Sequence, residues 1–334
     1  MSFSTLSLAD ELSVMRDGKR SYWPSLWNRK DVVRAVQETR SLNSLVTDSA
    51  AASSAWGSGR RVWNGQVNEF PDGTKLRPIA SIVREAGVRV GLVTTTTMTH
   101  ATPAGFAVNS PTRDDEAFIA ERYLESGVDV LFGGGAKFFD PKLRKDGKDL
   151  YALFAAKGYD VARSRDELMA SRGARALGIF SPSHVPFAVD RANDSAIAKA
   201  VPTLAEMAKI ALAKLDGGRN GFLLQIEGGK VDHGADANDL AAMLYDQLDF
   251  EDAVRVAMEF AEKDGETLVI VTTDHACGGP ALNGAGEEYI ESTAGLRTVL
   301  GMKSSYAPLL EAAGKAPSAA TVSDVVLAKL GLSL

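Results

Sequence analysis

The sequence has little cysteine and no long apolar run. Cys277 is the single cysteine among 334 residues, so no disulfide can form within the chain. No apolar stretch approaches the ~20 residues that a membrane-spanning helix needs. The first twenty residues also lack the basic start and apolar core of a signal peptide. We therefore expect no membrane partner.

An excess of positive charge is missing as well. Asp and Glu number 43 against 37 Lys and Arg, which gives a net charge of −6. Nucleic acid is bound mainly through clustered Lys and Arg, so we expect no nucleic-acid partner. No repeat, charge block or Pro/Ser-rich linker divides the chain, and we expect a single domain over residues 1–334.

Apolar, β-branched runs alternate with helical patterns along the chain. The sequence predicts strands at Val88–Thr95, Val128–Phe132, Ala176–Phe180, Gly221–Ile226 and Thr267–Thr273. It predicts helices at Asp114–Ser126, Thr203–Leu215, Leu240–Lys263 and Val322–Leu330. Several strands are almost continuously apolar, as in parallel sheets covered on both faces. The pattern indicates an α/β fold, a three-layer αβα sandwich with a largely parallel central sheet.

Polar groups follow three of the predicted strands: His100 and Thr102, Glu227 and Asp232, and Asp274 and His275. Ligand sites in open α/β sheets gather beyond the carboxyl ends of the strands. Carboxylate, imidazole and hydroxyl groups that meet there are suited to binding metal ions.

Small residues surround Ser49 in the run Asp48–Ala55 and favour a tightly packed helix start. At a helix N-terminus, free N–H groups and the helix dipole stabilise a serine alkoxide or an incoming phosphate. The alternative is that Asp48 or Ser49 simply caps the helix.

Four acceptor side chains lie between Glu227 and Asp236. Their oxygens suit magnesium, and a mixture of oxygen and nitrogen suits zinc. Gly228 and Gly229 would let the backbone approach a ligand. A solvated acidic loop is the alternative.

Two further motifs have similar alternatives. Asp274 and His275 suit zinc or belong to a solvated turn. Arg113 could grip a phosphate with two hydrogen bonds or lie on the surface before a helix.

Together and in this order, the motifs resemble the alkaline phosphatase family. They are Thr47-Asp48-Ser49-Ala50, His100 to Ala104 with Arg113 eleven residues after Thr102, Glu227 with Asp232, and Thr272 to His275. The resemblance covers about residues 1–334 and implies a metal-dependent phosphomonoesterase that takes small phosphomonoesters and inorganic phosphate. Ser49 would be the nucleophile, forming a phosphoserine and contacting metal.

The resemblance also implies a ligand set. Asp274 and His275 resemble ligands of the zinc that activates the serine, and Asp232 a ligand of a second zinc. Thr102 and Glu227 resemble magnesium ligands, and Arg113 the arginine that holds phosphate oxygens. His100, His233 and Asp48 would lie around these ligands, and the histidines suggest that the third site accepts zinc as well as magnesium. Periplasmic or secreted location and a homodimer are further family expectations.

Three departures from the family pattern qualify these expectations. The family pattern has an early strand ending in Asp-Gly-Met, and this sequence lacks that strand. Met1–Ser4 resembles the residues that follow Asp-Gly in the family, so we expect Met1 to be an internal methionine of a longer gene. No histidine follows His275, which indicates a missing C-terminal segment. Asp236 stands where the family has a histidine; its carboxylate could ligate zinc as a conservative change or could mark a lost site, and the second zinc site is expected to be impaired.

Two alternatives to the phosphomonoesterase stay open. One is a phosphodiesterase of the same superfamily. The other is a non-catalytic or weakly active remnant that binds metal or phosphate.

Overall fold

The computed structural model describes residues 2–282, 284 and 289–333. The strands are β1 (Arg89–Thr97), β2 (Val130–Gly134), β3 (Asp160–Ala162), β4 (Ala176–Ile179) and β5 (Phe222–Glu227). The helices of the first half are α1 (Phe3–Asp17), α2 (Trp23–Trp27), α3 (Ser49–Ser58), α4 (Ile79–Glu85), α5 (Ala101–Ala107), α6 (Glu116–Ser126), η1 (Ala136–Phe138), α7 (Leu150–Ala156) and α8 (Arg165–Ala170). Those of the second half are α9 (Ala188–Asn193), α10 (Ser195–Ala200), α11 (Leu204–Leu215), α12 (Lys230–Asp236), α13 (Leu240–Asp264), η2 (Tyr289–Leu296), α14 (Arg297–Gly301), α15 (Tyr306–Ala313) and α16 (Ala319–Leu330).

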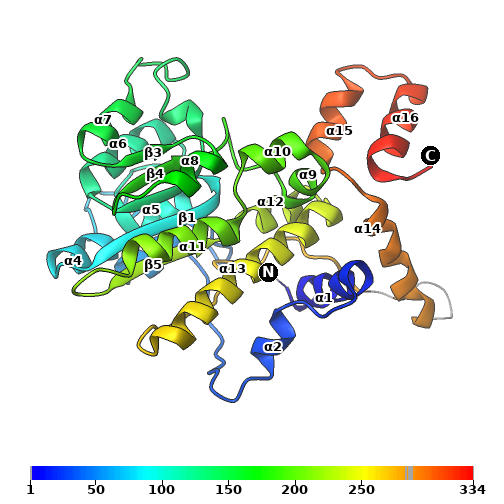
Figure 1. Ribbon diagram of the computed structural model, residues 1–334, viewed down its shortest axis with the longest axis horizontal. Coiled ribbons are helices and arrows are strands. Elements are labelled where there is room, and N and C mark those ends of the chain that lie inside the picture. Colours follow the sequence, from blue (N-terminus) through cyan, green and yellow to red (C-terminus); the bar gives the residue numbers. More distant parts are fainter. Residues whose placement is uncertain (1, 283, 285–288, 334) are drawn as a thin grey trace.

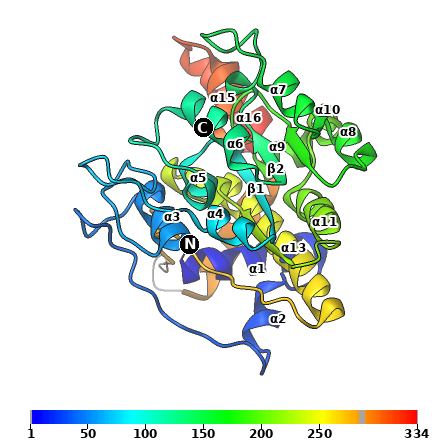
Figure 2. The same ribbon diagram turned by 90° about the vertical axis from the view of Figure 1, so that its left-hand side faces the viewer.

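The described strands form one parallel sheet in the order β3-β4-β2-β1-β5, so β5 is an edge strand (Figure 1). Successive side chains of a strand point to opposite faces. Accordingly, Leu131 packs into the apolar core on one face, and Val130 and Phe132 pack into the core on the other. Helices α4, α5 and α6 cover the first face, while α11 and α13 cover the second (Figure 2). The three-layer α/β fold is confirmed.

Local sequence signals explain where the longer helices begin and end. Thr203 and Glu206 form a capping box at the start of α11, in which each side chain bonds the other residue's backbone N–H. The helix α13 begins after Asp239, whose side chain accepts from Ala242 N, and ends at Gly265 with positive φ. All four predicted helices are confirmed, with boundaries within three residues of those expected.

The predicted strand Thr267–Thr273 is wrong, because this segment forms no strand in the structure. Its residues and those of the edge strand β5 line a shared cavity of about 1240 Å³, and the segment is not one of the strands of the sheet. Leu268 and Ile270 are consequently 82% and 76% exposed. The apolar, β-branched pattern is correct, but a strand also needs a backbone partner.

The short strand β3, at Asp160–Ala162, was not predicted. Three residues are too few to show a periodic pattern, and its pairing with β4 is what forms it. No helix in the described part of the chain is both long and apolar enough to cross a bilayer.

Candidate active site

Ser49 is the first residue of α3, as the sequence predicts. Asp48 caps this helix: its Oδ1 accepts from Ala51 N at 2.9 Å, and its Oδ2 accepts from Gly65 N at 2.8 Å. The Ser49 residue is 6% exposed. Capping and an active serine are therefore compatible, because Asp48 fills the cap and leaves the Ser49 hydroxyl free for other contacts.

Small residues allow α3 to approach α5 closely. A Cβ atom on Gly57 would lie 1.9 Å from the Gly105 carbonyl oxygen, and one on Gly105 would lie 2.3 Å from Ser53 Oγ. The Ser53 hydroxyl also donates to the Ala101 carbonyl oxygen at 2.9 Å. This contact fixes Ser49 relative to α5, which carries Thr102.

The serine meets the predicted zinc ligands. Ser49 Oγ lies 3.2 Å from His275 Nε2, and the same nitrogen lies 3.2 Å from Asp274 Oδ2. His275 Nδ1 is 3.9 Å from Asp232 Oδ1. Ser49, His275 and Asp232 therefore lie together, although they come from three distant parts of the sequence.

Arg113 joins the serine helix to His100. Its Nη1 donates to Asp48 Oδ2 at 3.1 Å, and its Nη2 lies 3.0 Å from His100 Nε2. A guanidinium has no acceptor, so Nε2 accepts and the hydrogen of neutral His100 is on Nδ1. His100 Nδ1 is buried and has no hydrogen-bond partner among the described residues. This N–H is therefore available to an acceptor oxygen.

Three histidines form a cluster that the sequence motifs only partly reveal. The ring centroid of His184 lies 4.5 Å from that of His233 and 5.9 Å from that of His100. The ring centroids of His100 and His233 are 5.7 Å apart. His184 Nδ1 accepts from Thr97 N at 3.0 Å. Burial lowers the pKa of His184 to about 4 and that of His233 to about 3, and it holds the pKa of His100 well below its usual value. All three histidines are therefore neutral near pH 7.

His184 is a functional candidate that the sequence alone did not single out. It follows β4 by five residues and belongs to no motif of the resemblance. The carboxyl end of a predicted parallel strand was the one signal that could have indicated it.

Glu227 ends β5 and is held by β1. Its Oε2 accepts from Thr94 Oγ1 at 2.6 Å. Burial raises the pKa of Glu227 to about 7, and the nearby Asp274 and Asp232 carboxylates act in the same direction, whereas Thr94 and Thr102 lower it. Thr102 Oγ1 lies close enough to influence this carboxyl, but it is buried without a partner of hydrogen-bond geometry among the described residues.

The two glycines after Glu227 serve packing, a role that the sequence interpretation did not include. A Cβ atom on Gly228 would lie 2.8 Å from Phe250 Cβ, and one on Gly229 would lie 2.4 Å from Thr96 Cγ2. They are needed so that the turn into α12 fits between α13 and β1.

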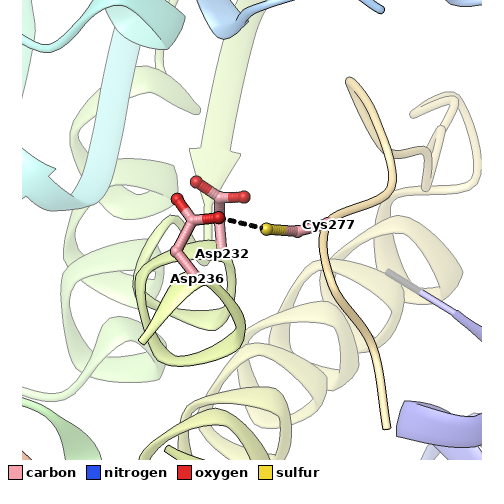
Figure 3. A group of neighbouring side chains, drawn as sticks. All are labelled: Asp232, Asp236 and Cys277. Atoms are coloured by element: carbon pink, nitrogen blue, oxygen red, sulfur yellow. Dashed lines mark hydrogen bonds between the residues drawn. The ribbon is translucent and has the colours of Figure 1, made fainter. Parts of the chain in front are cut away.

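Asp232 and Asp236 lie one turn apart on α12 and face Cys277 (Figure 3). Their ligand atoms and Cys277 Sγ all lie within 4.8 Å of one another. Cys277 Sγ donates to Asp236 Oδ1 at 2.6 Å. Burial and the two carboxylates raise the pKa of the Cys277 thiol to about 12, and burial raises the pKa of Asp232.

A sequence model of alkaline phosphatases matches residues 1–312. The chain belongs to the alkaline phosphatase family. Among its relatives, alkaline phosphatase 3 of Bacillus subtilis (strain 168) is 34% identical over 72% of this chain and 51% of that protein. The repressible alkaline phosphatase of Saccharomyces cerevisiae is 35% identical over 72% of this chain and 47% of that protein. The chain thus spans about half the length of these curated relatives.

Solved alkaline phosphatases have the same fold. The Thermus thermophilus enzyme superposes with a TM-score of 0.96 at 41% identity, covering 100% of this chain and 70% of that chain. A His-to-Asp mutant of TAB5 alkaline phosphatase, solved with Mg bound in its M3 site, superposes with a TM-score of 0.63 at 28% identity, covering 78% of this chain and 75% of that chain.

The residues of this alkaline phosphatase family member fit metal ions. Two buried oxygen atoms on predicted ligands, Thr102 Oγ1 and Asp232 Oδ1, have no hydrogen-bond partner in the described part of the chain. Buried polar atoms are almost always satisfied, so both oxygens are open to a bound group. Oxygen, imidazole and carboxylate donors are those that zinc and magnesium take in proteins.

Proposed function

We propose that this chain hydrolyses phosphomonoesters through a phosphoserine at Ser49. The observation that carries the proposal is the 3.2 Å distance between Ser49 Oγ and His275 Nε2 at the start of a capped helix. The names of the relatives support the same reaction, including a streptomycin-6-phosphate phosphatase of Streptomyces griseus that is 34% identical over 69% of this chain.

The reaction divides between two displacements at phosphorus. In the first, the Ser49 hydroxyl loses its proton, the bond from Oγ to phosphorus forms, and the bond from phosphorus to the alcohol oxygen breaks. The departing alcohol takes up a proton. In the second, water attacks the phosphoserine, releasing inorganic phosphate and restoring the Ser49 hydroxyl.

Other residues of the chain bind and position the substrate. Arg113 lies beside the serine helix, and its guanidinium can hold two phosphate oxygens and stabilise their charge in the transition state. The three neutral histidines add N–H donors without adding charge. The free N–H groups at the start of α3 point toward the same negative charge.

The predicted metal ligands divide among three sites. Asp274 and His275 would hold zinc beside Ser49, Asp232 and Asp236 a second zinc, and Thr102 and Glu227 magnesium. When bound, these ions supply positive charge that stabilises the attacking and leaving oxygens. The TAB5 mutant structure, which has Mg bound in its M3 site, supports a magnesium position in this fold. Export and homodimer formation are further proposals that rest on the family alone.

Purified protein with added zinc and magnesium tests the proposal. We expect hydrolysis of an aryl phosphate, much slower hydrolysis of an aryl phosphodiester, and loss of turnover in Ser49→Ala. Ser58→Ala, at the far end of the same helix, is the matched control and should retain turnover. Unchanged turnover in Ser49→Ala would refute the proposal, and metal uptake without turnover in the wild type would favour a non-catalytic binding role.

A further inference from the structure

The group formed by Asp232, Asp236 and Cys277 differs from the ligand set that the family resemblance implies. There the second zinc takes a histidine at the position of Asp236, and the cysteine has no assigned role. In this chain, the three side chains bring two carboxylates and one thiol to the same point beside α12 (Figure 3).

We propose that Cys277 is a metal ligand, and that with Asp232 and Asp236 it forms a carboxylate–carboxylate–thiolate site for a thiophilic divalent ion such as zinc. This inference rests on the proposed function only for the place of the site. It changes the expectation that the second site is impaired, because a third protein ligand replaces the missing histidine.

The geometry fits one ion. Zinc lies about 2.0–2.3 Å from carboxylate oxygen and thiolate sulfur, so two ligand atoms at tetrahedral positions lie about 3.3–3.8 Å apart. The three ligand atoms here already lie within 4.8 Å of one another, and small side-chain movements would bring them onto a shared ion. Three protein ligands leave a fourth tetrahedral position for water or substrate, as in catalytic zinc sites.

Two independent observations point to a positive ligand. Asp232 Oδ1 is buried and has no hydrogen-bond partner in the part of the chain that the structure describes. Within those same residues, neither Asp232 nor Asp236 pairs with Lys or Arg; the one charged-group contact is His275 Nδ1, 3.9 Å from Asp232 Oδ1. Two neighbouring carboxylates repel each other, and no Lys or Arg among the described residues offsets this repulsion, so a bound cation would relieve it.

The choice of sulfur predicts the kind of ion. A thiolate favours zinc, cobalt and cadmium over magnesium, which prefers oxygen ligands alone. The thiol must release its proton when the metal binds, so one proton leaves Cys277 for each ion bound. No oxidant or further reactant is needed.

Cobalt(II) added to the metal-free full chain tests this assignment. A thiolate bound to cobalt(II) gives a charge-transfer absorption in the near ultraviolet that carboxylates and imidazoles do not give. Because Cys277 is the single cysteine, such a band can come from no other residue. We expect the band in the wild type, its loss in Cys277→Ser, and slower reaction of the thiol with a thiol-specific reagent once cobalt is bound.

Further variants separate this inference from the proposed function. Ser49→Ala should lose turnover and keep the band, since Ser49 is not part of this ligand set. Asp236→Asn should weaken cobalt binding at this site by at least about 10-fold, which is the low end of losses seen for metal-site substitutions. Circular dichroism of each variant checks that it is folded. Cobalt binding to the folded wild type without the band, or with unchanged thiol reactivity, would overturn the assignment whether or not the chain hydrolyses phosphomonoesters.

Discussion

Arg113 Nη1 donates to Asp48 Oδ2 at 3.1 Å, so the predicted phosphate-binding arginine is tied to the cap of the helix that begins with Ser49. The two functional parts of the site are therefore not independent. The position of the guanidinium depends on Asp48, and Asp48 is itself fixed by backbone N–H groups of Ala51 and Gly65.

Replacing Arg113 tests whether it stabilises the transition state. Arg113→Ala should lower kcat/KM for an aryl phosphate by about 10²–10³-fold, as for loss of a group that stabilises developing negative charge. Arg113→Lys should retain only part of the wild-type kcat/KM, because an ammonium cannot make two parallel hydrogen bonds to phosphate. Arg122→Ala on the exposed surface of α6 is the control, and an Arg113→Ala enzyme that matched it would contradict the role.

Replacing Asp48 separates its cap from its charge. Asp48→Ala should lower the free energy of unfolding by about 1 kcal/mol, because the Ala51 N–H loses its acceptor. Asp48→Asn keeps an acceptor oxygen and should cost less stability, but it removes the charge beside Arg113. Denaturant unfolding together with kinetics would distinguish the two effects. Equal losses of stability in both variants would argue against the capping role.

Replacing the buried hydroxyl of Thr102 should change the stability of the protein differently with and without magnesium. In metal-free protein, Thr102→Val should leave the stability unchanged or raise it by about 1 kcal/mol, because a buried hydroxyl with no hydrogen-bond partner among the described residues is replaced by a methyl group. With magnesium, wild type should gain more stability than the variant, because only its hydroxyl can bind the ion.

Thr99→Val is the matched control for this test. Thr99 is equally buried, and its hydroxyl donates to Glu116 Oε2 at 2.7 Å. Its loss should cost about 1.5–3 kcal/mol in either condition, since the acceptor is a charged group. Thermal melts with and without magnesium measure both variants, and a clear loss of stability in metal-free Thr102→Val would contradict the assignment.

The histidine cluster predicts how the stability of the metal-free protein depends on pH. The pKa of His184 is about 4 in the folded chain and about 6.5 when unfolded. Between these values the unfolded state binds more protons, so stability is complete above pH ~6.5 and falls as the pH decreases toward 4. The contribution of His184 to the free energy of unfolding is on the order of 1 kcal/mol, allowing for the partial exposure of its side chain.

His184→Asn should reduce this pH dependence, because asparagine can still accept from Thr97 N but does not titrate. His233, whose pKa is lowered to about 3, contributes in the same direction and remains in the variant. Urea unfolding from pH 4.5 to 7.5 measures the slope. An identical slope in wild type and variant would exclude His184 as a contributor.

The sequence predicts the positions of the candidate residues well where a short motif coincides with the end of a strand or the start of a helix. Ser49 at a helix start and Glu227 at a strand end could be assigned because one local pattern determines both their structure and their position. Cys277 and His184 could not, since what makes them notable is their proximity to side chains far away in the chain. The segment Thr267–Thr273 shows the same limit for the fold, because its pattern is that of a strand and its place outside the sheet is not encoded locally.

The measurement that most directly tests the account is identification of the phosphorylated residue. Metal-loaded protein would be mixed with an aryl phosphate, quenched in acid during turnover, digested and analysed by mass spectrometry, with Ser58→Ala as the control and Ser49→Ala as the negative. The account predicts phosphate on Ser49 in the wild type and in Ser58→Ala, and none in Ser49→Ala. Turnover with phosphate on another residue, or with the same labelling in Ser49→Ala, would contradict it.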